Sequence, residues 1–241
     1  MDPRVKKIVE SAKRMVFFGG AGVSTESGIP DFRSESGLYN AMQEYGRPPE
    51  TMLSHDFFMQ ETRTFFDYYK KNLIYKDAKP NKAHLALARL ESEGHLAAIS
   101  TQNIDGLHQK AGSKKVYELH GSVQRNSCMK CGAKYSLDFI LDEKNNIDGI
   151  PVCPSCGGII KPDVVLYGEM LDENEIQGTV EAISNADVLM VGGTSLAVYP
   201  AASFVRYFRG NTLILINKSE TALDKNADLV IREPIGEVLG D

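Results

Sequence analysis

The chain has 241 residues, of which 42% are hydrophobic and 24% charged, and its formal net charge is −5 at pH 7. This composition is that of a globular protein with a core, and the negative charge argues against a general nucleic-acid binder, which must neutralise phosphates. No apolar run reaches the roughly eighteen residues of a membrane span, and the N-terminal segment lacks the apolar core of a signal peptide. We therefore expect a cytoplasmic protein.

The first predicted elements are a helix over residues 3–14 and a buried strand over 15–18. Asp2 followed by proline is typical of a helix start, and hydrophobic residues recur at helical spacing up to Ala12. The strand ends in Gly19 and Gly20, and the segment after it could open a helix whose amides point at a pyrophosphate.

The glycines of this turn suit a dinucleotide-binding loop only in part. Gly20 and Gly22 permit a tight turn and close approach to a ligand. Thr25 stands where the G-x-G-x-x-G motif has its third glycine, and no acidic residue ends the next strand about twenty positions on. A plain glycine-rich turn between strand and helix is the alternative.

Residues 34–80 interrupt the strand–helix rhythm. Residues 34–37 and 46–49 are loop-like, and Pro48-Pro49 argues against a helix there. An aromatic stripe follows at the spacing of short helices, and core packing or a lid-like insert would both account for it. Its members are Phe57, Phe58, Phe65, Phe66, Tyr68 and Tyr69.

Strands and helices alternate again after residue 80, which is typical of a parallel sheet covered by helices. The sequence therefore predicts an α/β fold with a doubly wound, Rossmann-like parallel sheet. The predicted helices cover residues 80–93, 173–184 and 200–208, and the predicted strands cover 96–101, 116–119, 188–191 and 212–217.

All four cysteines form two C-x2-C pairs, Cys128 with Cys131 and Cys153 with Cys156, which 21 residues separate. This separation lies just outside the usual window of about 15–20 residues for four-cysteine zinc sites, and a loop at 145–149 would absorb the difference. Four thiolates give closed tetrahedral ligation without an open position for chemistry. We expect one structural Zn²⁺, with redox-active or unpaired thiols as the alternative.

Polar side chains follow three of the predicted strands. Ligands in doubly wound folds lie outside the carboxyl ends of the strands, so these side chains should converge on one crevice. They are Ser24 and Arg33 after the first strand, Gln102, Asn103 and Asp105 after the second, and His120 after the third.

Together these motifs resemble the sirtuin family of NAD-dependent protein-lysine deacylases, in its bacterial type with a single compact catalytic core. The resemblance covers nearly the whole chain. It rests on Gly20–Ser24, Gly28–Arg33, Thr101–His108, His120-Gly121, the two C-x2-C pairs, Lys161–Glu169, Gly193–Leu196 and Val198–Ala202.

The resemblance implies a division into domains. Residues 1–33, 81–121 and 165–241 would form the Rossmann-like NAD-binding domain. Residues 34–80 would be a helical insert of the small domain, and residues 122–164 a zinc-binding module.

The resemblance also implies which residues bind NAD. The pyrophosphate would lie over residues 20–22, the adenine ribose near Asn217, the adenine near Ile235 and the nicotinamide near Ile29 and Asp105. The full set of expected contacts is Gly20, Ala21, Gly22, Thr25, Phe32, Arg33, Gln102, Ile104, Asp105, His120, Thr194, Ser195, Asn217 and Ile235.

In the reaction that the resemblance implies, the acyl group passes from lysine to ADP-ribose, releasing nicotinamide and O-acyl-ADP-ribose. His120 would be the general base for a ribose hydroxyl, Asn103 and Ser24 would orient the ribose, and Phe32 would shield the reacting carbon from water.

The expected substrates are acyl-lysine proteins or peptides, which would pair as an added strand with two segments of the chain. These segments comprise Val164, Val165, Leu166, Tyr167, Gly168 and Glu169 on one side and Leu196 and Val198 on the other. A core strand is the alternative for the first segment.

Phe66 and Tyr69 would wall the acyl tunnel, by alignment with the Tyr-x-x-Arg pair of relatives that prefer acidic acyl groups. Neither side chain supplies a cation, so we expect acetyl or apolar acyl groups. In another register Lys70 or Lys71 would reach inward.

Three functions remain open from the sequence: a deacylase, a protein ADP-ribosyltransferase using the same NAD pocket, and a non-catalytic NAD-sensing or zinc-bearing adaptor. His120 favours the deacylase, because transfer to a side chain does not need a base for the ribose. We expect a monomer without direct nucleic-acid or membrane contacts.

Overall fold

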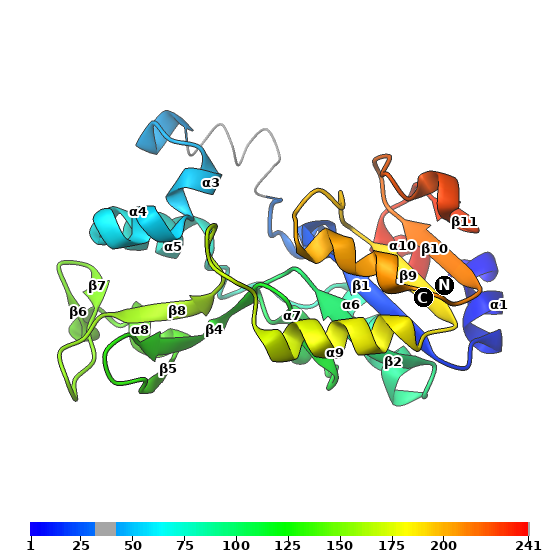
Figure 1. Ribbon diagram of the computed structural model, residues 1–241, viewed down its shortest axis with the longest axis horizontal. Coiled ribbons are helices and arrows are strands. Elements are labelled where there is room, and N and C mark those ends of the chain that lie inside the picture. Colours follow the sequence, from blue (N-terminus) through cyan, green and yellow to red (C-terminus); the bar gives the residue numbers. More distant parts are fainter. Residues whose placement is uncertain (32–41, 241) are drawn as a thin grey trace.

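The structure, a computed structural model, describes residues 1–31 and 42–240 and has two lobes (Figure 1). The larger lobe is built on a parallel sheet of β1 (Met15–Gly19), β2 (Leu96–Thr101), β3 (Val116–Glu118), β9 (Val188–Gly192), β10 (Thr212–Ile216) and β11 (Leu229–Ile231). Their spatial order is β11-β10-β9-β1-β2-β3, and each neighbouring pair runs parallel. This is the doubly wound Rossmann order, which reverses between β1 and β9, and it confirms the predicted fold class.

The strand β1 shows how the sequence builds a core on both faces of the sheet. All five of its residues are buried. Met15 and Phe17 belong to one hydrophobic cluster, whereas Val16 and Phe18 belong to another on the opposite face. Because side chains alternate along a strand, a continuous apolar run fills both faces.

Helices cover both faces of the large sheet. The first cluster includes residues of α1 (Pro3–Ser11), α6 (Lys82–Ser92) and α10 (Ile235–Leu239). The second includes residues of α9 (Glu173–Ser184) and of the 3₁₀ helix η4 (Ala201–Tyr207). The short helix α7 (Leu107–Lys110) follows β2.

The smaller lobe contains α3 (Pro49–Met52), α4 (His55–Gln60), α5 (Thr62–Asn72) and α8 (Leu137–Leu141). Its three-stranded antiparallel sheet has the order β5 (Lys134–Ser136), β4 (Gly121–Cys128), β8 (Ile160–Val164). A hairpin of β6 (Asn146–Ile147) and β7 (Ile150–Pro151) extends from it.

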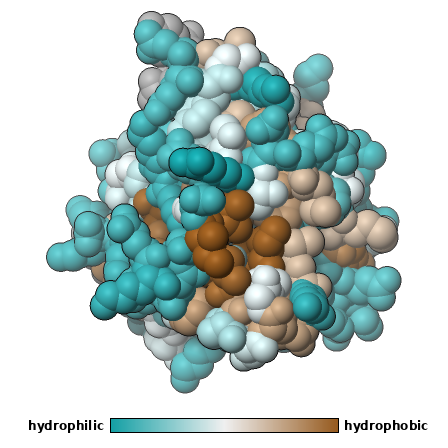
Figure 2. Space-filling view, turned by 90° about the vertical axis from the view of Figure 1, so that its left-hand side faces the viewer, coloured by the Kyte–Doolittle hydropathy of each residue, from teal (hydrophilic) through white to brown (hydrophobic). Residues whose placement is uncertain are grey.

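The aromatic stripe of the insert forms the core of this lobe. Phe58, Phe65, Phe66 and Tyr69 contact one another with ring centroids 5.0 to 6.4 Å apart. At the far end of the lobe, a hydrophobic patch has hydrophilic residues on one side and weakly hydrophobic residues on the other (Figure 2). Because all six side chains of the stripe are buried, the stripe is packed inside the lobe, as the first of the two interpretations predicted.

Several predicted elements differ from the structure. The helix expected after β1 is a pair of 3₁₀ turns, η1 (Ala21–Val23) and η2 (Thr25–Ser27), while α1 ends at Ser11 because Ala12 is extended. Contrary to expectation, α3 begins at Pro49, where proline at the first helical position loses no hydrogen bond.

The predicted helix over 200–208 is also a 3₁₀ helix. Its buried residues include Ala201 with Phe204 and Ala202 with Val205, and this spacing of three matches the 3₁₀ repeat. Two other 3₁₀ turns are η3 (Glu143–Asn145) and η5 (Asp224–Asn226). In the described part of the chain, no helix is both long and apolar enough to cross a membrane.

Candidate active site and metal centre

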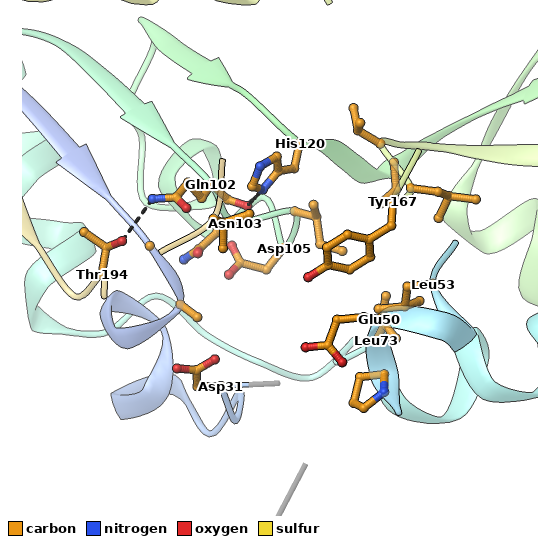
Figure 3. Close-up of a pocket in the computed structure, with 18 of the residues that line it drawn as sticks. Asp31, Glu50, Leu53, Leu73, Gln102, Asn103, Asp105, His120, Tyr167 and Thr194 are labelled. Carbon is orange, nitrogen blue, oxygen red and sulfur yellow. Dashed lines mark hydrogen bonds between the residues drawn. The ribbon is translucent and has the colours of Figure 1, made fainter. Parts of the chain in front are cut away.

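A cavity of about 250 Å³ lies between the lobes, next to the carboxyl ends of β1, β2 and β9 (Figure 3). From the small lobe, α3 and the segment after β8 reach its wall. The cavity brings together many residues that the sequence predicted. These are Gly20, Ala21, Ser24, Ile29, Gln102, Asn103, Ile104, Asp105, His120, Val164 to Glu169, Thr194, Ser195 and Val198.

His120 lies between β3 and β4, with its ring at the cavity. Its Nδ1 is 2.9 Å from the backbone oxygen of Gln102. Because a carbonyl oxygen only accepts, the neutral ring carries its proton on Nδ1 and has its basic lone pair on Nε2. The Gln102 side chain donates to Thr194 Oγ1 at 3.0 Å, which joins the ends of β2 and β9 beside this base.

Ser24 is the centre of a buried polar network beneath the cavity. Its hydroxyl donates to Asp105 Oδ2 at 2.7 Å and accepts from Asn103 Nδ2 at 3.0 Å. His84 Nε2 lies 3.4 Å from the same oxygen. The Asn81 backbone N–H donates to His84 Nδ1 at 3.3 Å, so Nε2 carries the proton and donates to Ser24. Each of these side chains is thereby held in one orientation.

Asp105 is the acidic member of this network. Burial raises its pKa above the ordinary value, whereas hydrogen bonds from the Leu107 backbone and Ser24 oppose that shift. Its two oxygens accept from these two donors, at 2.8 Å from Leu107 and 2.7 Å from Ser24. The carboxyl group therefore has a fixed position against the cavity.

The sequence analysis did not identify His84 as part of this site. A signal was present in the spacing of Asn81 and His84 at the start of α6. Asn81 caps the helix and the side chain three residues on returns the hydrogen bond, which is the geometry of a capping box. The unused ring nitrogen then points at Ser24.

The glycines of the first loop are required by packing within the protein. A Cβ on Gly20 would lie 2.8 Å from the Thr194 Cβ, and one on Gly22 would lie 2.8 Å from the Gly193 Cα. The Gly22 N–H also donates to the Gly193 carbonyl at 2.8 Å. The loop after β1 therefore packs directly on the loop after β9, and this contact shapes that edge of the cavity.

The segment after β8 is held by both lobes. Its Val165 N–H donates to the His120 carbonyl, and its Tyr167 N–H donates to the Leu53 carbonyl, both at 2.9 Å. Glu169 accepts from Lys161 at 3.0 Å and from the Leu166 N–H at 2.9 Å. The segment is thus a fixed wall of the cavity rather than a continuation of β8, which ends at Val164.

The four cysteines come together at one end of β4. Their Sγ atoms all lie within 4.8 Å of one another, with Cys128 and Cys156 at 3.4 Å and Cys131 and Cys153 at 3.7 Å. Tetrahedral zinc with Zn–S bonds of about 2.3 Å separates its sulfurs by about 3.8 Å. The donor set therefore fits one closed zinc site, as predicted.

A tyrosine lies directly behind this sulfur cluster. The Tyr135 hydroxyl is 2.9 Å from Cys153 Sγ, and its ring packs on Phe139 with centroids 4.4 Å apart. The hydrogen bond from Tyr135 lowers the pKa of the Cys153 thiol. It thereby favours the thiolate, which is the form that binds a metal.

Some predicted site residues lie elsewhere. Asn217 follows β10 and donates to the Ser219 carbonyl at 2.8 Å. Ile235 and Leu196 are 4% and 8% exposed and pack in the two cores of the large lobe. Thr25 donates to the Gly22 carbonyl at 3.0 Å. None of these four is among the described residues that line the cavity.

The structure places both residues of the predicted acyl wall inside the small lobe. Phe66 and Tyr69 are fully buried in the aromatic core of the small lobe and are not among the lining residues. The insert instead reaches the cavity through Pro49, Glu50, Leu53 and Leu73. Both side chains lie on the face of α5 that packs against the core of the small lobe. Phe32 and Arg33 lie outside the described residues.

Comparisons with known proteins agree with this geometry. The model of the family described as "Sir2 family" matches residues 20–200. A protein of Clostridium acetobutylicum named NAD-dependent protein deacetylase is 61% identical over 235 residues, covering 98% of this chain and 95% of that protein. One of the same name from Clostridium tetani is 57% identical over 242 residues, covering 100% and 97%.

Solved structures agree as well. One described as Sir2 with a p53 peptide and NAD+ has a TM-score of 0.85 at 35% identity, covering 98% of this chain and 95% of that chain. A Sir2 variant with a deacetylated p53 peptide and 3'-O-acetyl-ADP-ribose has a TM-score of 0.88 at 36% identity, covering 99% and 96%. Sir2 with a propionylated peptide has a TM-score of 0.85 at 35% identity, covering 98% and 94%.

Proposed function

The chain belongs to the Sir2 family, and from that premise we propose that it is an NAD-dependent protein-lysine deacetylase. Relatives of which this chain covers 95% and 97% carry that name, and similar structures hold NAD, acyl peptides or acetyl-ADP-ribose. The products are nicotinamide, the free lysine and O-acyl-ADP-ribose.

The observation that carries the proposal is the placement of His120. Its Nδ1 lies against the Gln102 carbonyl, so Nε2 is the nitrogen that would take a proton from a ribose hydroxyl. Asn103 and Ser24 lie in one hydrogen-bonded network at the same cavity and would orient that ribose. Asp105 would contact the nicotinamide amide from the fixed position that Ser24 gives it.

The remaining contacts that we propose for NAD follow the arrangement of the loops. The pyrophosphate would lie at residues 20–22, with Thr194 and Ser195 from the loop after β9 bordering it. Asn217 and Ile235 would meet the adenosine half beyond the cavity, because both lie at the carboxyl side of the sheet past β9. Thr25, Phe32 and Arg33 complete the proposed set.

The substrate is an acyl-lysine peptide, consistent with the acetylated and propionylated peptides in similar structures. We propose that it lies between the segment Val164–Glu169 and residues 196–198, with the acyl-lysine entering the cavity. Val165 to Tyr167 already use their N–H groups within the protein, so other backbone groups of this segment would pair with the peptide.

The zinc site is structural in this proposal. Cys128, Cys131, Cys153 and Cys156 would hold one Zn²⁺, which with four protein ligands supplies stability rather than chemistry. The cluster lies at the end of β4 and just before the start of β8, the strand whose continuation past Val164 forms the peptide wall.

The domain division predicted from the sequence is part of the same proposal. Residues 1–33, 81–121 and 165–241 contain every strand of the six-stranded sheet, which supports their grouping as the NAD-binding domain. Residues 34–80 and 122–164 would form the small domain. We further propose a cytoplasmic monomer that does not bind nucleic acid directly.

The test is to mix the protein with NAD and an acetyl-lysine peptide and to measure product masses. Deacetylation predicts a peptide lighter by one acetyl group together with acetyl-ADP-ribose and nicotinamide. A peptide or protein heavier by ADP-ribose would identify a transferase, and unchanged NAD would contradict both enzymatic functions.

A further inference from the structure

The wall of the cavity between the lobes is rich in carboxylates. Asp31, Glu50, Asp105 and Glu169 line it, whereas no lysine or arginine is among its described lining residues. Asp31 and Asp105 project from the large lobe and Glu50 from α3 on the opposite side, and all three are directed towards the same hollow (Figure 3). An acyl-lysine substrate must place its acyl group in this space.

The two lysines of α5 that could have reached inward are engaged elsewhere. Lys70 Nζ donates to Asn146 Oδ1 and to the Gly149 carbonyl, both at 2.8 Å, which attaches it to the β6–β7 hairpin. Lys71 forms an ion pair with Glu44. The partners of both lysines thus lie outside the described lining of the cavity.

Three of these carboxylates differ in how their charge is balanced. Glu169 is paired with Lys161 at 3.0 Å. Asp105 is buried, and its two oxygens accept internal hydrogen bonds. Glu50 is exposed at the mouth, and it has no ion pair or hydrogen bond with a described residue. Of these three carboxylates, Glu50 is thus the one whose charge a bound acyl group would meet most directly.

We propose that Glu50 makes this cavity select against acyl chains that end in a carboxylate and favour neutral chains or chains that end in an ammonium group. The inference rests on the proposed deacylase function and assigns its acyl range to a residue of α3. A carboxylate brought close to Glu50 without a cation is repelled, and leaving water for such a site raises that penalty. An ammonium group at the same position is attracted instead.

The experiment uses one peptide with four acyl groups on its lysine. Succinyl ends in a carboxylate, succinamyl is its neutral amide of the same shape, β-alanyl ends in an ammonium group, and acetyl reports the basic activity. The kcat/KM of each is measured for the wild type, Glu50→Gln, Glu50→Lys and Glu61→Gln. Glu61 is an exposed glutamate that precedes α5, outside the cavity lining, so its variant controls for net charge.

The expected ratios follow from the size of the charge change. Glu50→Gln should raise the succinyl-to-succinamyl ratio about threefold, the effect of one partly solvated ion pair. Glu50→Lys changes the charge by two units, so the ratio should rise about tenfold. The β-alanyl-to-succinamyl ratio should fall by similar factors, and Glu61→Gln should leave both ratios unchanged.

The outcomes separate the two proposals. A wild type that uses succinyl as well as acetyl peptide, or Glu50 variants with unaltered ratios, would overturn the role of Glu50 and leave the deacetylase intact. No NAD-dependent loss of acetyl from any peptide would overturn the proposed function and this inference with it. Opposite shifts for succinyl and β-alanyl would show that charge, not size, is selected.

Discussion

His120 lies at the cavity with its Nδ1 against the Gln102 carbonyl, and its replacement should affect chemistry more than binding. His120→Ala should lower deacetylation by roughly 10²-fold or more, because no general base would remain for the ribose hydroxyl. NAD should still bind, since its proposed contacts lie mostly on other residues. Steady-state kinetics measure the loss of turnover, and calorimetric titration measures NAD binding. Near-normal turnover in the variant would show that His120 is not the general base.

His84 and His108 are two buried histidines whose protonation affects the stability of the fold. Their exposures are 0% and 1%, and their rings meet edge to face at 4.8 Å. Within the described part of the chain, neither ring nitrogen of His108 has a hydrogen-bond partner. Burial lowers the pKa of His84 to about 4, and burial with the nearby His84 lowers that of His108 to about 3.

These pKa shifts make the fold sensitive to acid. Below about pH 6.5 the unfolded chain binds protons at both histidines, whereas the folded chain stays neutral there until about pH 4. The unfolding free energy should therefore fall as pH falls through this window, by up to about 1.4 kcal/mol per pH unit for each histidine. Above the window this contribution is fully present.

Urea denaturation between about pH 7.5 and about pH 5 measures this slope. In His108→Leu an apolar side chain replaces the buried imidazole. Unfolding should then take up about one proton fewer, and the slope should fall accordingly. His95→Gln, a change at a half-buried position after α6, is the control. An unchanged slope in His108→Leu would show that His108 takes up its proton in the folded state.

At the scale of elements, Gly121 permits the start of β4 beside β8. Its φ is +73°, and a Cβ there would lie only 1.9 Å from the Asp163 carbonyl oxygen. Gly94, after α6, has a φ of +84° but no atom within 4 Å of such a Cβ. An alanine at either position would be strained by the left-handed backbone, but only at Gly121 would its Cβ also clash with another strand.

Gly121→Ala should consequently be much the more destabilising of the two variants. Gly94→Ala should lose about 1 kcal/mol from its left-handed backbone. Gly121→Ala should lose about 1–3 kcal/mol more, because β8 must move. Thermal and urea unfolding measure the stability of both variants. Equal losses of unfolding free energy would mean that β4 and β8 move apart at Gly121 at little cost.

Elements whose evidence is local could be predicted closely from the sequence. The strand at 96–101 and the helix at 173–184 have the predicted bounds, because an apolar run and the Asp172 cap define them. Contacts between distant segments were not visible in the sequence: Gly22 packs on Gly193 within a 3₁₀ turn, where a helix was expected. The inward turn of Phe66 likewise depends on which face α5 gives to its own lobe.

The same reasoning applies to the site. The zinc ligands and the residues at strand ends could be predicted, because spacing and topology place them. Glu50 could not, since an isolated glutamate after two prolines has no pattern that marks it as part of a cavity. His84 could have been found only from its capping geometry with Asn81.

At the scale of the whole molecule, loss of zinc should weaken binding of the acyl peptide more than binding of NAD. The cysteines lie in the small lobe, where β4 and β8 lead directly to the peptide wall, whereas the residues proposed for NAD lie mainly on the large lobe. Removing zinc should therefore weaken acyl-peptide binding before it weakens NAD binding.

Titration with a chelator, followed by binding measurements for each substrate, checks this order. About one zinc per chain should be released, with partial unfolding detected by circular dichroism. Readdition of zinc should restore peptide binding and so control for damage by the chelator. Equal loss of both affinities would mean that the two lobes unfold as one unit, and active protein without metal would contradict a structural zinc.

The connection between the lobes at His120 allows almost no variation in length. Glu118 ends β3 and Gly121 begins β4, so the whole link is Leu119, which is fully buried, and His120 itself. One inserted residue adds about 3.3 Å of extended chain, more than the 2.9 Å from the imidazole to its Gln102 acceptor. An insertion or deletion in this link would therefore move the imidazole away from its acceptor and from the cavity.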